Sequence, residues 1–167
     1  SLFTKAQKLE VKTRLYQNNQ SISGALTLPN YRRKNQKVTL FTEIEKEQTD
    51  AFDSTTASVG TDIERFFTKR TKGRIGLHAD FTRLEENEET DDLALLSVPI
   101  ALEYDRRDSA LDPRKGWAGA ITVEPYWDAY ETDTQFLRTI FAFSAYTSFE
   151  EITWRPTLAL RTSFGAI

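Results

Sequence analysis

The chain has 167 residues and a formal net charge of −3, which suits one domain and is too small a charge to indicate a nucleic-acid partner. Cysteine is absent, which excludes disulfides, thiolate catalysis and zinc–thiolate sites. No apolar run approaches the roughly 18 residues of a transmembrane helix. The mean hydropathy of −0.52 leaves membrane β-strands open, because only one face of such a strand is apolar.

Apolar and polar residues alternate along most of the chain, a pattern typical of half-buried β-strands. In the segment 37–46, Val38, Leu40 and Ile44 share one face and Glu43 lies on the other. The alternation predicts an all-β fold, an antiparallel up-and-down meander of about nine strands, with no helical pattern of comparable length. The expected strands span residues 3–16, 22–28, 37–46, 55–67, 74–84, 93–104, 117–127, 136–146 and 154–164.

The later strands differ in how clearly the pattern assigns their faces. In the segment 93–104, one side is expected to carry Leu96, Val98, Ile100 and Leu102. The segment 136–146 is nearly continuous in apolar residues, so its faces stay unassigned. We find no linker, repeat or domain boundary.

The turns between the expected strands alternate between basic and acidic. The basic turns hold Arg32, Arg33, Lys34, Lys37, then Lys69, Arg70, Lys72, Arg74, then Arg106, Arg107, Arg114 and Lys115. The acidic turns hold Glu45, Glu47, Asp50, Asp53, then the run 85–92, then Asp128, Glu131 and Asp133. Alternate turns of a meander lie on the same edge, so one rim would be basic and the other acidic. This suits a barrel that stands across a membrane.

Strand length and aromatic residues favour the same interpretation. Most expected strands reach the roughly nine to eleven residues of a tilted membrane strand, rather than the five or six typical of globular proteins. Aromatic residues gather at strand ends and predict two interfacial girdles: Tyr104, Trp117, Tyr146, Phe149 and Trp154 at one level, and Tyr126, Trp127 and Tyr130 at the other. The alternative is that these are core aromatics of a soluble sheet.

An odd number of strands would leave an unpaired edge near Leu9 and another near Leu160. Methionine is absent as well, so no initiator residue is present. We therefore expect residues 1–167 to be a single partial segment of a larger transmembrane β-barrel.

The most specific stretch is the turn 104–117, YDRRDSALDPRKGW. Asp and Pro favour a turn, Gly116 can adopt positive φ, and an interfacial Trp117 restarts the strand. This turn resembles the periplasmic turn of the bacterial surface-antigen outer-membrane barrels, the superfamily that includes BamA, TamA and the two-partner secretion transporters. The segment 23–31, SGALTLPNY, is similar to a family strand that ends before another such turn. The TamA type, an assembly factor for autotransporters, is the preferred member.

The resemblance implies a function in transport rather than in chemistry. The parent protein would insert or export outer-membrane proteins such as autotransporters, by strand pairing at an openable seam and with no catalysis. It implies location in the bacterial outer membrane, with the basic turns facing the periplasm. The implied partners are the lipid bilayer, unfolded outer-membrane clients, the remainder of the barrel and periplasmic POTRA domains. The POTRA domains and the closing strands are absent from this sequence, and no nucleic acid, cofactor or metal is implied.

Few individual residues indicate a site. His78, the single histidine, falls on the polar face and is a poor candidate for catalysis or metal binding. The acidic run 85–92 lacks the glycine and spacing of a calcium loop and is expected to be a solvated loop. Polar-face charges such as Lys12, Glu43, Asp62 and Arg161 could form a hydrated network.

Two other classes of protein stay open at this stage. A soluble all-β barrel or sandwich that binds a small apolar ligand would enclose Leu96, Val98, Ile100 and Leu102 in its interior. An enzyme on a β scaffold would need a nucleophile facing a base, which one histidine and no cysteine make the least favoured reading.

Overall fold

The computed structural model describes residues 7–49, 52–86, 89–130, 135–149 and 156–167. None of these residues form a helix long and apolar enough to cross a membrane. They form ten β-strands. The strands are β1 (Lys8–Leu15), β2 (Asn19–Pro29), β3 (Gln36–Gln48), β4 (Asp53–Phe66), β5 (Thr71–Glu86), β6 (Glu89–Ser97), β7 (Ile100–Asp105), β8 (Gly116–Asp128), β9 (Gln135–Ser148) and β10 (Thr157–Ala166).

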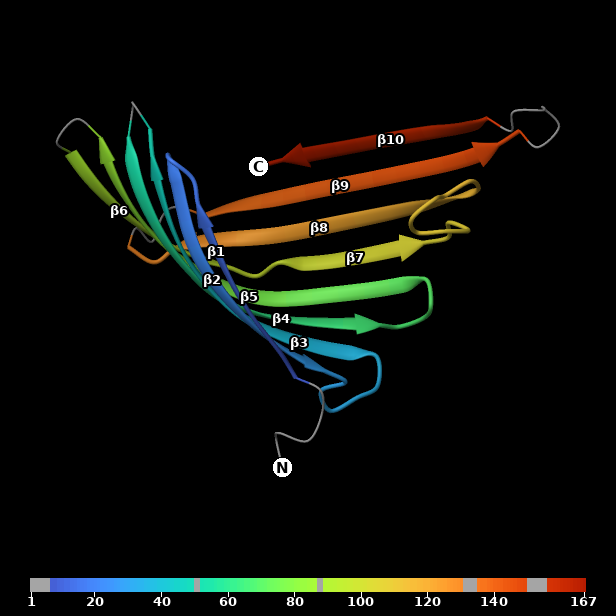
Figure 1. Ribbon diagram of the computed structural model, residues 1–167, viewed down its shortest axis with the longest axis horizontal. Helices are drawn as coiled ribbons and strands as arrows, with labels where there is room; N and C mark the ends of the chain where they lie inside the picture. Colours follow the sequence, from blue (N-terminus) through green and yellow to red (C-terminus); the bar gives the residue numbers. More distant parts are fainter. Residues whose placement is uncertain (1–6, 50–51, 87–88, 131–134, 150–155) are drawn as a thin grey trace.

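All ten strands belong to one sheet in which neighbouring strands are antiparallel and follow chain order. Figure 1 shows this sheet as a strongly curved wall, with β1 and β10 as its edges. The predicted all-β antiparallel meander is therefore confirmed. Residues 3–6 of the first expected strand, and Trp154 and Arg155 of the last, lie outside the described residues.

The expected strand 93–104 is interrupted, so the count is ten rather than nine. β6 and β7 both lie between β5 and β8, and the register continues across the break, from the pair Ser97–His78 to the pair Ile100–Ile75. The cause is proline, which has no N–H to donate to the ladder. Pro99 accepts a bond from the Gly76 amide at 2.9 Å but returns none. The sheet thus has nine strand positions, one of them split.

Strand length agrees with a membrane wall. The unbroken strands β2, β3, β4, β5, β8 and β9 are 11, 13, 14, 16, 13 and 14 residues long. Strands of this length exceed the common globular range and can cross a bilayer at a tilt.

Most of the large apolar side chains lie on one face of the sheet and are exposed, not enclosed. Ile75 and Ile100 are each 49% exposed, and Leu158 is 61% exposed. Among the described residues, the buried apolar side chains are small or few: Ala94, Pro99, Ala101 and Tyr146. The soluble alternative required an enclosed interior around Ile100 and its neighbours, so that alternative is wrong. We call this side the apolar face and the opposite side the polar face.

Pairing with β8 assigns the two faces of β9, which the sequence left open. Leu137 pairs with Pro125 and Phe141 with Ile121, which places both on the apolar face. Phe136, Arg138 and Tyr146 pair with Tyr126, Glu124 and Gly116, and therefore lie on the polar face.

The basic turns gather at one edge of the sheet. In Figure 1, the β2–β3, β4–β5 and β7–β8 turns all lie on the right, whereas the β1–β2 turn lies at the opposite edge. Main-chain bonds join neighbouring turns: the Phe66 amide donates to Asn35 O at 2.9 Å, and the Asp105 amide donates to Arg70 O at 2.8 Å. The right-hand edge is therefore a continuous basic rim, as the charge pattern predicted.

Candidate functional site

A row of five residues crosses the polar face of neighbouring strands. Successive register pairs join Phe41 to Gly60, Gly60 to His78, His78 to Ser97, and Ser97 to Tyr126. Because residues paired across antiparallel strands point to the same side, these residues line one transverse strip of the wall. Two residues of this strip, His78 and Ser97, take part in polar contacts around Glu124.

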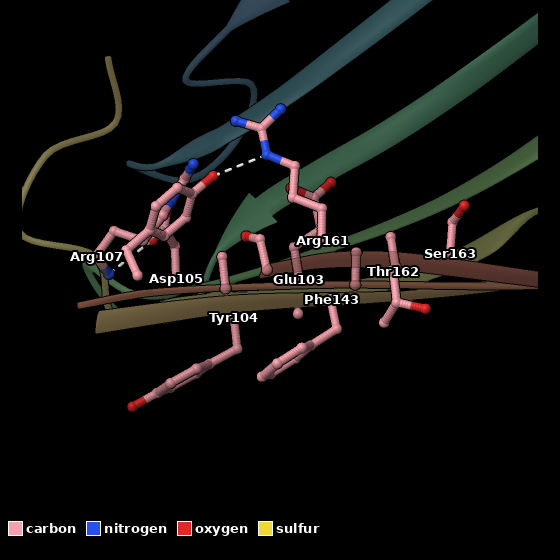
Figure 2. A pocket seen from close by; sticks show the side chains of 14 residues that line it. Glu103, Tyr104, Asp105, Arg107, Phe143, Arg161, Thr162 and Ser163 are labelled. Carbon is pink, nitrogen blue, oxygen red and sulfur yellow. Dashed lines mark hydrogen bonds and ion pairs between the residues drawn. The ribbon is translucent and has the colours of Figure 1, made fainter. Parts of the chain in front are cut away.

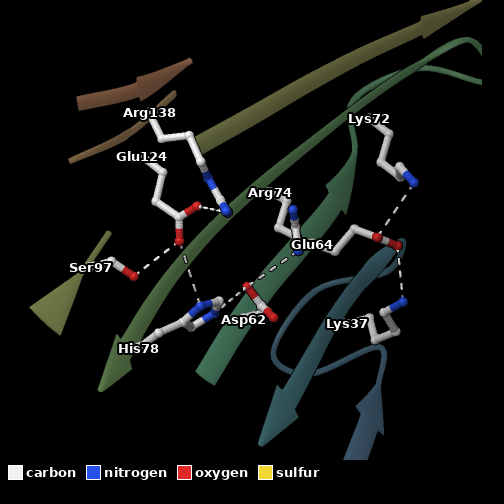
Figure 3. A network of polar contacts seen from close by, with 9 residues as sticks. All are labelled: Lys37, Asp62, Glu64, Lys72, Arg74, His78, Ser97, Glu124 and Arg138. Carbon is white, nitrogen blue, oxygen red and sulfur yellow. Dashed lines mark hydrogen bonds and ion pairs between the residues drawn. The ribbon is translucent and has the colours of Figure 1, made fainter. Parts of the chain in front are cut away.

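Glu124 is the centre of these contacts and is only 4% exposed. The Ser97 hydroxyl donates to its carboxylate at 3.0 Å, and the Arg138 guanidinium pairs with the second oxygen. His78 lies between two carboxylates, with Nε2 3.3 Å from Asp62 and Nδ1 4.0 Å from Glu124. Figure 3 shows these side chains converging from β4, β5, β6, β8 and β9. We call Asp62, His78, Ser97, Glu124 and Arg138 the polar cluster.

A second set of ion pairs lies toward the basic rim. The Glu64 carboxylate is held between Lys37 Nζ at 3.1 Å and Lys72 Nζ at 3.5 Å (Figure 3). Lys72 also reaches Glu103 at 3.0 Å. These contacts cross four strand positions from β3 to β7, so charged side chains join adjacent strands along the wall.

Aromatic rings pack beside the polar cluster. The Phe41 ring meets the His78 ring edge-on, with centroids 4.9 Å apart at 83°. Gly60 leaves room for both rings, because a Cβ there would lie 2.5 Å from Phe41 and 2.7 Å from His78. The Tyr126 ring stacks on Phe136 at 4.5 Å. Tyr126 therefore faces the polar side, and its predicted place in an interfacial girdle is wrong.

The turn 104–117 is organised by one carboxylate. Asp108 Oδ1 accepts from the amides of Ser109, Arg114 and Lys115 at 2.9, 3.0 and 3.1 Å. These bonds stabilise the charged form, so the Lys115 and Arg114 amides hold the pKa of Asp108 below its ordinary value. Asp108 is thus the residue that folds the loop back on itself.

Gly116 permits the strand to restart after this turn. Its φ is +104°, and a side chain there would meet the Arg106 carbonyl. The next residue, Trp117, packs against Tyr104 with ring centroids 4.9 Å apart, and against Phe143 at 6.0 Å. Tyr104 and Trp117 thus lie together beside the basic rim, as the predicted girdle required, and Phe143 joins them as a ring that the sequence did not assign to it.

The two faces are sharply different beside this turn. In Figure 2, Tyr104 and Phe143 project to one side of the strands, while Arg107 and Arg161 project to the other. On the polar side, Arg161 Nε donates to the Tyr146 hydroxyl at 3.0 Å. Tyr146 is only 8% exposed and belongs to the polar face, so its predicted interfacial position is also wrong. These residues border a hollow of about 540 Å³.

The structure separates the four charges that the sequence grouped together. Asp62 lies in the polar cluster, Glu43 lies 3.8 Å from Arg14, and Arg161 contacts Tyr146. Lys12 lies on β1, two residues along the same face from Glu10. In place of one network, the polar face has several local ones.

The acidic run 85–92 is only partly described. Within it, Asp92 pairs with Arg83 at 2.8 Å. In the part of the chain that the structure describes, no group of three or more metal-ligating side chains comes together.

Three members of the polar cluster were missed by sequence reasoning: Ser97, Glu124 and Arg138. Glu124 stands out in the sequence as the one charged residue in the expected strand 117–127. Arg138 has the same status in the segment 136–146, and assignment of the faces there would have shown the pair.

A curved wall of long antiparallel strands, with an exposed apolar face and a polar, charged face, defines a segment of a transmembrane β-barrel. The model of the Omp85 superfamily domain matches residues 2–167, and the chain belongs to the Omp85 superfamily. This membership and the fold place the chain in the bacterial outer membrane. The apolar face therefore meets lipid and the polar face meets the lumen.

Among 14 matching chains of known structure is the crystal structure of BamA from Haemophilus ducreyi lacking POTRA domains 1-3. It matches with a TM-score of 0.71 at 10% sequence identity, over 84% of this chain and 31% of that one. This likeness shows the fold. No curated protein matches the sequence.

Proposed function

We propose that this chain is part of the barrel wall of a protein that inserts or translocates other outer-membrane proteins. The supporting observation is the superfamily match over residues 2–167, together with a wall whose two faces fit lipid and water. The remaining strands of the barrel would pair with the open edges β1 and β10. Periplasmic POTRA domains would belong to the same full-length protein.

The proposed mechanism needs no chemical step. A client strand would pair at a seam elsewhere in the barrel, and the present segment would hold the opposite wall rigid while the seam opens. The ladder of β2 to β5 and the ion pairs around Glu64 support such a rigid role, because they tie each strand to the next.

The test is client folding in liposomes of bacterial lipids that contain the full-length protein. The probe is an urea-unfolded eight-stranded outer-membrane barrel, and its folding is followed by heat-modifiable mobility on gels. We expect faster folding than in empty liposomes. Equal folding rates with and without the protein would overturn the proposal.

The finer proposal is that the clients are autotransporters, as expected of a TamA-type member. The turn 104–117 supports the superfamily, of which the TamA type is one member. Depletion of the protein should then reduce surface display of an autotransporter while most other outer-membrane barrels assemble normally. A general loss of outer-membrane barrels would indicate a BamA-type role instead.

A further inference from the structure

A groove on the apolar face lies close to the basic rim. Its volume is about 360 Å³, and its lining is almost wholly apolar. The walls are Ile63, Ile75, Ile100 and Leu102. At one end lies Gly73, which is paired with Arg65 on one side and Leu102 on the other, and which has no side chain of its own in that row. We call this feature the Gly73 groove.

The end of the Gly73 groove nearest the rim is closed by Phe67. A Cβ on Gly73 would lie 2.6 Å from the Phe67 ring, so the ring folds over the glycine. The β4–β5 turn holds Phe67 in place. Its amide donates to Thr71 O at 3.0 Å, and the Thr68 hydroxyl accepts from the Arg70 and Thr71 amides at 3.1 and 3.0 Å. The groove is therefore preformed.

Arg65 stands at this closed end. Its guanidinium carbon lies 5.8 Å from the centre of the Phe67 ring. In the described chain no carboxylate lies within ion-pair distance of Arg65, whereas Arg83, on the same face at the opposite rim, pairs with Asp92. An arginine at the boundary between lipid and water without a protein anion beside it is suited to a phosphate, which it binds with two parallel N–H donors.

We propose that the Gly73 groove binds one anionic phospholipid from the surrounding leaflet. An acyl chain lies between Ile63, Ile75 and Leu102, and the headgroup phosphate binds Arg65, near the β4–β5 turn that carries the exposed Lys69 and Arg70. Charge complementarity selects this occupant. The exposed lining of the groove is apolar and a cationic side chain lies at its rim end, which matches the apolar acyl chain and the anionic headgroup of such a lipid. The site requires only that the apolar face meets lipid, so it stands apart from the proposed assembly activity.

The experiment is native mass spectrometry of the full-length protein in detergent. The protein is titrated with equal amounts of dimyristoyl phosphatidylglycerol and dimyristoyl phosphatidylcholine, and the lipid retained by each variant is counted. We expect one phosphatidylglycerol to be retained in preference to phosphatidylcholine. Arg65→Gln should weaken phosphatidylglycerol binding about tenfold and abolish the preference, because it removes a charge-assisted pair of bonds.

Two further variants test the two halves of the site. Arg65→Lys keeps the charge and should retain a weakened preference for phosphatidylglycerol. Ile75→Ala removes part of one apolar wall of the groove and should reduce retention of both lipids, with folding verified by heat-modifiable mobility. Arg83→Gln is the matched control and should bind like the wild type. Equal retention by wild type and Arg65→Gln, or equal losses in Arg65→Gln and Arg83→Gln, would overturn the proposal.

Discussion

At the scale of single residues, the polar face depends on positions where size and charge are fixed by neighbours across strands. Gly60 is one of them, because the rings of Phe41 and His78 occupy the space a side chain would need. Glu124 is another, because it is buried with two donors directed at it. Both residues can be tested by a small substitution, each compared with a control substitution elsewhere in the sheet.

Gly60→Ala should destabilise the full-length protein by about 1–3 kcal/mol, because the added methyl forces Phe41 and His78 apart. The control is Gly24→Ala on β2, where the nearest atom to a new Cβ is Thr42 Cγ2 at an ordinary 3.7 Å. That variant should change stability by less than about 0.5 kcal/mol. Urea unfolding in micelles measures both, and equal losses would contradict the predicted clash.

Glu124→Gln should cost about 1–3 kcal/mol, because the buried carboxylate that pairs with Arg138 and accepts from Ser97 loses its charge. Glu103→Gln is the control, since Glu103 is 45% exposed and its partner Lys72 keeps a second carboxylate, Glu64. This control should lose less than about 1 kcal/mol. The same urea titration compares the two variants, and a smaller loss for Glu124→Gln than for Glu103→Gln would show that burial does not strengthen the pair.

The contrast between predicted and missed residues has a physical cause. Alternation reports which face a residue occupies, so Asp62 and His78 were placed correctly on the polar face. It does not report which residues of neighbouring strands are paired across the sheet. That pairing register, which the sequence pattern does not contain, brings Ser97 beside His78 and Arg138 beside Glu124. Tyr126 and Tyr146 were misplaced because their ring chemistry suits both an interface and a polar lumen.

At the scale of elements, strand positions were predictable and strand continuity was not. Eight of the nine expected segments overlap a single strand each, whereas 93–104 splits at Pro99. Alternation continues through the break because the register is unbroken, so the pattern carries no sign of it. The proline itself was the available signal, since it cannot donate in a central strand.

The turn 104–117 supplies the prediction at this scale. Since the pKa of Asp108 is lowered in the folded turn, its contribution to stability is complete above the ordinary pKa of an aspartate. The contribution is lost as pH falls through the lowered value. Amide chemical shifts of Arg114 and Lys115 should therefore move together in that acidic range.

Asp108→Asn is the matched variant for this titration. Its side-chain oxygen can still accept the Arg114 and Lys115 amides, but it has no proton to gain in the acidic range. Both amide shifts should then be flat with pH. A titration of the same midpoint in Asp108→Asn would assign the effect to another carboxylate.

At the scale of the whole molecule, the order of the strands in the sheet brings the basic turns together at one edge. Alternate turns lie on one edge, and the three basic ones are joined there by main-chain bonds. The sequence could predict this rim because a meander leaves no other place for alternate turns. It could not predict the shape of the Gly73 groove, which depends on a ring from a turn folding over a neighbouring strand.

The direction in which this wall crosses the membrane is the last prediction. The similarity of the turn 104–117 to periplasmic turns predicts that the basic rim faces the periplasm. One exposed position at each rim suits a label: Lys69 in the β4–β5 turn and Tyr130 after β8. Each can carry a single cysteine, since this sequence has none of its own.

In cells whose full-length protein carries Tyr130→Cys as its single cysteine, a membrane-impermeant maleimide should label intact cells. Lys69→Cys should be labelled only after the outer membrane is permeabilised, because the bilayer separates its rim from the medium. Labelling of denatured protein provides the control for thiol reactivity at each site. The reverse labelling pattern would show that the basic rim faces the cell exterior. The lipid proposed for the Gly73 groove would then belong to the outer leaflet rather than the periplasmic one.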